Sequence, residues 1–95
     1  MGIKTRKIGS ALEKKGFLKK EGGRHTIYYF VVNGKRIGIH TELSRGIKEY
    51  SRGLLSAMHK QLKFNNISEL EDFIECPLSK DDYIDILKRK NILFW

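Results

Sequence analysis

A chain of 95 residues, 40% of them hydrophobic, is long enough for one domain with a single modest core. Nineteen Lys and Arg against eleven Asp and Glu leave a formal charge of +8, which favours a polyanionic partner, nucleic acid or an anionic membrane surface, over a small acidic molecule. Because no apolar run of about 18 residues and no signal-peptide core is present, we expect a cytoplasmic protein without a membrane span.

The first predicted helix begins at Thr5, whose hydroxyl is expected to cap it, and its apolar residues follow helical spacing. Gly16 is suited to end this helix, because glycine tolerates the left-handed conformation that follows a helix C-terminus. Residues 17–20 predict a short strand and residues 21–23 a turn. Residues 24–32, rich in aromatic and β-branched side chains, predict a longer second strand.

Asn33-Gly34 is the strongest hairpin signal in the chain, so residues 35–40 are expected to return as a third strand. Residues 41–50 are then expected to form a loop. Ser51 is predicted to cap a second helix, in which one apolar stripe consists of Leu54, Leu55, Met58 and Leu62.

Two further helices are predicted after Asn65-Asn66 interrupts the second one. The first opens with a capping-box pattern at residues 68–71 and ends before Pro77. The next begins at Ser79, and its apolar side is formed by Tyr83, Ile84 and Leu87. The order α-β-β-β-α, followed by two helices, is typical of an α+β domain with a three-stranded antiparallel sheet.

The register of the predicted hairpin decides which side chains share a face of the sheet. With a two-residue turn at Asn33-Gly34, His40 would lie opposite Ile27 and diagonal to His25, within roughly 7–8 Å between Cα atoms. One face is then expected to be the core, with Tyr28, Phe30, Val32, Ile37 and Ile39. The other face would bring together His25, Tyr29, Arg36 and His40.

The second helix carries a basic stripe beside its apolar one. At 100° per residue, one side of this helix holds Arg52, Ser56, His59, Lys60 and Lys63. Such a helix can pack on a sheet and still offer cations to phosphates, and a solvated helix face explains the same pattern.

Several sequence segments, in order, resemble a known family. The first helix ends in LEKKGF at residues 12–17, and GGRHTIY follows at residues 22–28. The hairpin NGKR, the strand end IGIH and the helix LLSAMHKQL come at residues 33–36, 37–40 and 54–62. Over residues 4–64 the chain thus resembles the HicA toxins, small ribonucleases with a fold similar to the double-stranded-RNA-binding domain (dsRBD-like).

This resemblance implies metal-independent cleavage of messenger RNA by the toxin component of a toxin–antitoxin system, with no cofactor and with a HicB-type antitoxin as partner. The family's glycine-x-x-histidine motif, which carries its catalytic histidine, falls on His25. The family usually has serine after the first glycine of this motif, where the present chain has Gly23.

The chemistry of RNA cleavage gives roles to these residues. RNA supplies its own nucleophile, the 2′-hydroxyl, so an enzyme needs a base, an acid and cations for the developing charge. We expect His25 to act as the general base and His40 as a partner acid. Tyr29 is expected to stack on a base. Phosphate contacts are expected from Arg24, Lys35, Arg36, Arg52 and Lys60.

Other functions stay open at this point. A non-catalytic RNA- or DNA-binding module on the same fold, or a protein-interaction subunit, would carry the same elements. A zinc site is disfavoured, because its candidate ligands lack close paired spacing: His25, His40, His59 and Cys76. Cys76 is the single cysteine and cannot form an intramolecular disulfide, which agrees with a reducing compartment.

Charge divides the chain into two expected parts. Residues 1–64 hold fifteen Lys and Arg against four Asp and Glu, a net charge of +11, and are expected to form the HicA-like RNA-binding and ribonuclease domain. Residues 65–95 have a net charge of −3 and are expected to form an acidic helical extension packed on or beside that domain. Three roles are open for this extension: covering the basic face, joining two copies as a homodimer, or extending the core.

Overall fold

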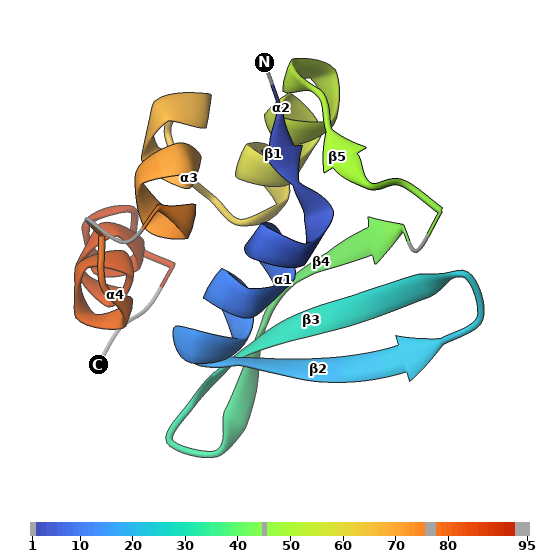
Figure 1. Cartoon of the computed structure of the whole chain (residues 1–95). Helices are drawn as coiled ribbons and strands as arrows, with labels where there is room; N and C mark the ends of the chain where they lie inside the picture. The colour runs from blue at the N-terminus through green and yellow to red at the C-terminus, as the bar shows by residue number, and fades with distance from the viewer. Residues whose placement is uncertain (1, 45, 76–77, 93–95) are drawn as a thin grey trace.

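The computed structural model describes residues 2–44, 46–75 and 78–92. Figure 1 shows a three-stranded sheet with one helix across its front and further helices gathered to one side. The elements in chain order are β1 (Ile3–Lys4), α1 (Thr5–Lys14), β2 (Phe17–Gly22), β3 (His25–Val32), β4 (Lys35–Ser44), β5 (Glu49–Tyr50), α2 (Arg52–Gln61), α3 (Ile67–Ile74) and α4 (Lys80–Arg89).

The main sheet is antiparallel, with strand order β2-β3-β4, so the expected α+β class with a three-stranded antiparallel sheet is confirmed. Two features depart from the expected elements. The two-residue strands β1 and β5 pair with each other in a second small sheet, and β4 runs on to Ser44 through residues that were expected to form a loop. In the described part of the chain, no helix is long and apolar enough to cross a membrane.

The turns at both ends of β3 contain two residues. At the β3–β4 turn, Asn33 and Gly34 have φ of +53° and +78°, which is the conformation that an Asn-Gly hairpin turn favours. Val32 lies opposite Lys35 as predicted. At the other end, β2 continues to Gly22, so Arg24 belongs to the turn and not to the strand as expected.

A β-bulge in β4 changes the register beyond the Asn-Gly turn. Tyr29 lies opposite His40, whereas the straight hairpin would place Ile27 there. Two extra residues of β4 are accommodated around Gly38, which has a φ of +84° that glycine adopts without strain. Because the shift is by two residues, each side chain keeps its predicted face of the sheet. The predicted diagonal contact between His25 and His40 is therefore wrong.

The first two helices begin differently from each other. Thr5 was expected to be the N-cap of α1, but it is the first helical residue and its hydroxyl donates to the Ile47 carbonyl at 2.6 Å. Its role is thus to tie α1 to the loop before β5. Ser51 does cap α2 as predicted, accepting from the Leu54 N–H at 3.5 Å.

The last two helices also have polar caps. Asn66, and not Ser68 as expected, caps α3 by accepting from the Glu69 N–H at 2.9 Å. Ser79 forms the predicted capping box with Asp82 at the start of α4. The Ser79 N–H and hydroxyl, which bond Asp82, lower the pKa of this carboxyl below its usual range. Pro77, expected to follow α3, lies outside the described residues.

The core lies between the sheet, α1 and the later helices. Its centre is Tyr83 of α4, which is fully buried and donates a hydrogen bond to the Leu62 carbonyl at 2.7 Å. Four phenylalanines surround its ring, with centroids 4.8–6.0 Å away: Phe17, Phe30, Phe64 and Phe73. Helices α3 and α4 thus share one apolar core with the sheet.

Candidate nucleic-acid interface

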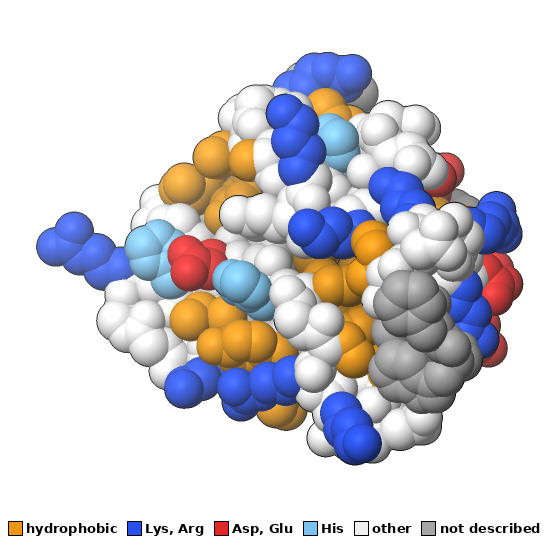
Figure 2. All heavy atoms as spheres, turned by 180° about the vertical axis from the view of Figure 1, so that it is seen from behind, with side chains coloured by type: hydrophobic (Ala, Val, Ile, Leu, Met, Phe, Trp, Pro, Cys, Tyr) orange, Lys and Arg blue, Asp and Glu red, His pale blue; other side chains and the backbone are white. Residues whose placement is uncertain are grey.

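The face of the sheet opposite to α1 is open to solvent. Along β3, the side chains that point to this face are His25, Ile27, Tyr29 and Val31, all exposed or half-buried, while the residues between them are more buried. Leu18 of β2 lies opposite Tyr29 and is 52% exposed. Figure 2, seen from this side, shows histidine and basic side chains around hydrophobic patches. We call this surface the open face.

Three side chains of the open face form a stacking cluster, consisting of Tyr29, Arg36 and His40. The Arg36 guanidinium carbon lies 4.3 Å from the centroid of the Tyr29 ring, a cation–π contact. The Tyr29 and His40 rings lie 6.0 Å apart at an angle of 36°. The bulge creates this cluster, because it places His40 directly opposite Tyr29.

His25 lies at the other end of the open face, as the first residue of β3. It is opposite Ser44, so it lies diagonal to Glu42, which is opposite Ile27. His25 and Glu42 line the same pocket of about 300 Å³, which we call the His25 pocket. The Glu42 carboxylate, a hydrogen-bond acceptor, therefore lies between His25 and His40 on this face. His40 is opposite Tyr29, four residues along β3 from His25, which separates the two histidines by about 13 Å.

Helix α2 forms the other wall of the His25 pocket. Its contribution comes from Leu54, Ala57, Met58 and Gln61, which recur at helical spacing on one side of α2. The end of β4 is fixed by Tyr50, whose hydroxyl accepts from the Ser44 N–H at 3.0 Å and donates to the Glu42 carbonyl at 3.3 Å. These bonds hold the backbone of Glu42 in place beside His25.

Glu42 is a site residue that sequence reasoning missed. It was assigned to a loop, yet a signal was present, because apolar or small side chains recur at every second residue from Ile37 to Leu43. This alternation of period two predicts that the strand continues through Thr41. In the structure Thr41 is fully buried and donates to Oε1 of Gln61 at 2.6 Å.

The remaining predicted phosphate contacts are exposed but dispersed. Arg24 lies in the turn before β3 and Lys35 begins β4 after the other turn, so the two are at opposite ends of the sheet. Arg52 and Lys60 are exposed on α2, on sides of the helix that do not line the His25 pocket. His59 is half-buried, and its Nδ1 lies 3.3 Å from the Phe64 carbonyl oxygen.

No protein-family model, characterised protein or solved structure matches the chain. The chemistry of the site is therefore inferred from its own side chains. Among the described residues, no group of three His, Cys, Asp or Glu side chains is arranged to hold a metal ion. Cys76, one of the disfavoured zinc ligands, lies outside the described residues.

The open face combines the chemical groups that RNA requires. An imidazole can accept and donate a proton near neutral pH. The Glu42 carboxylate lines the same pocket as His25, and neither ion pair of the described residues joins these two side chains. Aromatic rings and guanidinium planes are the surfaces on which unpaired bases stack. These two capabilities lie at the His25 pocket and at the stacking cluster, on one continuous face.

Proposed function

We propose that the protein binds single-stranded RNA on the open face and cleaves it, with His25 as the proton-transfer residue. The observation that carries this proposal is that His25 and Glu42 line one pocket, on the face that also holds the stacking cluster. The formal charge of +8 favours the same class of ligand.

In the proposed reaction, His25 accepts the proton of a 2′-hydroxyl whose oxygen attacks the adjacent phosphorus. The new O2′–P bond forms as the P–O5′ bond breaks, leaving a 2′,3′-cyclic phosphate and a 5′-oxygen that takes up a proton. Glu42 lines the same pocket and places a carboxylate on the side of His25 where the reaction takes place. Arg24, next to His25 in the turn, contributes positive charge for the phosphorane. Bound bases stack on Tyr29 and Arg36.

The wider assignment follows the resemblance to HicA toxins. The order α1–β2–β3–β4–α2, with α1 across one face of the sheet and the other face open, supports a dsRBD-like fold. On this basis the protein is the toxin component of a toxin–antitoxin system in the cytoplasm, and its activity on messenger RNA is held in check by a HicB-type antitoxin.

The decisive measurement is cleavage of single-stranded RNA by the wild type and by His25→Ala, in EDTA. We expect His25→Ala to lose at least about 100-fold in cleavage rate, the usual contribution of a positioned acid–base group, with unchanged RNA affinity. A 2′-O-methyl RNA should bind but not be cleaved. His59→Ala, a histidine away from the pocket, is the matched control. Equal cleavage by wild type and His25→Ala would refute the role of His25.

One observation favours a second function, a non-catalytic RNA- or DNA-binding module. The bulge leaves His25 without a second histidine nearby, so the site lacks the acid–base pair of the sequence-based hypothesis. Such a module would bind with an affinity that falls as salt rises, with a log–log slope near −0.7 per single-strand phosphate contact, and no preparation would cleave RNA.

A further inference from the structure

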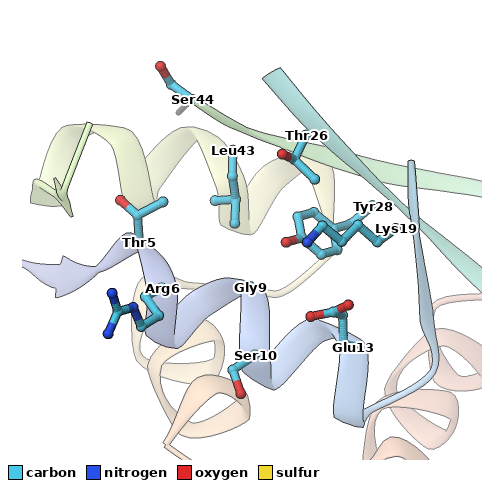
Figure 3. Close-up of a pocket in the computed structure, with 10 residues that line it drawn as sticks. All are labelled: Thr5, Arg6, Gly9, Ser10, Glu13, Lys19, Thr26, Tyr28, Leu43 and Ser44. Atoms are coloured by element: carbon cyan, nitrogen blue, oxygen red, sulfur yellow. The ribbon is translucent and has the colours of Figure 1, made fainter. Parts of the chain in front are cut away.

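A second pocket lies on the other side of the sheet, between α1 and the strands (Figure 3). It has a volume of about 280 Å³, and we call it the α1 pocket. Thr26 lines it from β3, next in sequence to His25, which points to the opposite face. Ser44 lines both pockets, so the two lie next to each other around the end of β4.

The floor of the α1 pocket contains the hydroxyl of Tyr28. The Tyr28 side chain is only 4% exposed, and its hydroxyl points into the pocket toward α1 (Figure 3). No buried side-chain nitrogen or oxygen atom of the described residues lacks a hydrogen-bond partner. The Tyr28 hydroxyl ends in the pocket, where solvent or a ligand can reach it.

Gly9 of α1 makes room for this hydroxyl. A Cβ atom at Gly9 would lie 2.7 Å from the Tyr28 hydroxyl oxygen, closer than such atoms pack. Glycine in a helix interior is unfavourable by roughly 0.5–1 kcal/mol relative to alanine. Its presence here is explained by the space that the Tyr28 hydroxyl occupies.

Charged groups of both signs lie near the Tyr28 hydroxyl, and one of them, the Lys19 ammonium, is 3.6 Å from Oε1 of Glu21. In Figure 3 the Glu13 carboxylate, from α1, and the Lys19 ammonium, from β2, both lie on the side of the pocket where the Tyr28 hydroxyl ends. Arg6 lies further along α1 at the edge of the same pocket. Burial, with the nearby Glu13 and Glu21 charges, raises the pKa of Tyr28, so its hydroxyl remains a donor.

We propose that the α1 pocket binds a guanine base of the RNA, an inference that rests on the proposed function. Guanine has two adjacent donors, N1–H and N2–H₂. The two oxygens of the Glu13 carboxylate would accept one hydrogen bond from each. The O6 acceptor would receive hydrogen bonds from Tyr28 and Lys19. Adenine would turn its N1 acceptor toward the Glu13 carboxylate and leave both unpaired. Arg6 would meet the phosphate.

The test uses 5′-mononucleotides as probes, with binding followed by NMR titration of the wild type. We expect guanosine monophosphate to bind about tenfold or more tightly than adenosine monophosphate, because a hydrogen bond to a charged group contributes about 1.5–3 kcal/mol. Inosine monophosphate lacks the exocyclic amine and should fall between them. Equal affinity for all three nucleotides, or no binding of any, would overturn the proposal.

Two variants assign the preference to the pocket. Glu13→Gln and Tyr28→Phe should each lose about tenfold in guanosine monophosphate affinity and approach the adenosine value. Asp85→Asn, an exposed acid on α4, is the matched control and should bind like the wild type. Thermal melting of each variant checks that the fold is retained. Retained guanine preference in both Glu13→Gln and Tyr28→Phe would place the site elsewhere.

The result of the nucleotide-binding test can be told apart from the result of the RNA-cleavage test. If His25-dependent cleavage occurs without any guanine preference, the α1 pocket is not a base site and the proposed function stands. If guanosine monophosphate binds as expected but no RNA is cleaved, the pocket belongs to a non-catalytic RNA-binding module.

Discussion

Lys15 is a buried cation that joins the first helix to the C-terminal part of the chain. Its side chain is 8% exposed, and its ammonium donates to the carbonyls of Phe73 and Leu78 and lies 4.8 Å from the Phe73 ring centroid. The Phe73 carbonyl belongs to the last turn of α3, where a cation is favoured by the helix dipole. A single side chain thus completes the end of a distant helix.

Substituting Lys15→Met keeps most of the apolar stem and removes the charge. We expect the free energy of unfolding to fall by about 1–3 kcal/mol, because the buried carbonyls lose their donor. Urea denaturation measures the change. Lys14→Met, at an exposed neighbouring position, is the control and should alter stability by less than about 0.5 kcal/mol. A Lys15→Met protein as stable as the Lys14→Met protein would contradict this role.

Tyr83 gives the protein a predictable response to alkaline pH. Burial raises the pKa of its phenol above the ordinary value of 10.0, since the charged form would lack solvation in the core. A folded-state pKa above the unfolded one means that the associated stability is complete below pH 10 and declines as pH rises further. We therefore expect Tyr83 to ionise only when the protein unfolds. Ultraviolet titration should show a cooperative tyrosinate step that coincides with loss of circular dichroism and is smaller in Tyr83→Phe.

Among the elements, the bulged strand β4 has the most influence on the candidate site. Gly38 has a positive φ and no atom within 4 Å of the position of an added Cβ, so a side chain there would meet backbone strain but no steric clash. Without the bulge, His40 would lie opposite Ile27 and the stacking cluster with Tyr29 would not form.

We expect Gly38→Ala to destabilise the protein by about 1–2 kcal/mol, the cost of a left-handed conformation for a residue with a Cβ. Gly22→Ala is the matched control, since Gly22 has equally open surroundings and no positive φ. Thermal melting compares the two variants. The expectation fails if both variants melt at the same temperature.

The elements that sequence predicted correctly are those set by local chemistry. The Asn33-Gly34 turn, the Ser51 cap and the Ser79 capping box each depend on residues within a few positions of one another. The Thr5 hydroxyl bonds to Ile47, and such a long-range partner is not encoded near Thr5. The predicted N-cap at Thr5 was therefore wrong, because the Thr5 hydroxyl bonds to a residue far away in the sequence.

The candidate site was predictable in part for the same reason. The common face of His25, Tyr29 and Arg36 follows from strand alternation, which a two-residue bulge preserves. The separation of His25 from His40 depends on the β-bulge in β4. The presence of Gly38 in the sequence does not by itself predict a bulge there. The α1 pocket requires Gly9 of α1 to meet Tyr28 of β3 where the helix packs on the sheet, a relation between two elements that no local pattern contains.

At the scale of the whole molecule, the two pockets lie on opposite sides of one thin sheet. They meet at Ser44, so a ligand that occupied both would pass around the end of β4. The apolar core beneath them includes α3 and α4, which carry most of the acidic residues of the C-terminal part. Two acidic side chains of α4, Asp81 and Asp82, lie in its first turn, where negative charge favours the helix. Neither ion pair of the described residues involves α4.

The position of Tyr83 among Phe17, Phe30, Phe64 and Phe73 has a consequence for the time course of biosynthesis. On the ribosome, residues emerge in order from the N-terminus, and domains generally fold as units. The Tyr83 ring, which fills the centre of the core beside the sheet, is translated only with α4. Residues 17–44 therefore reach their final packing only after residues 80–89 have been translated.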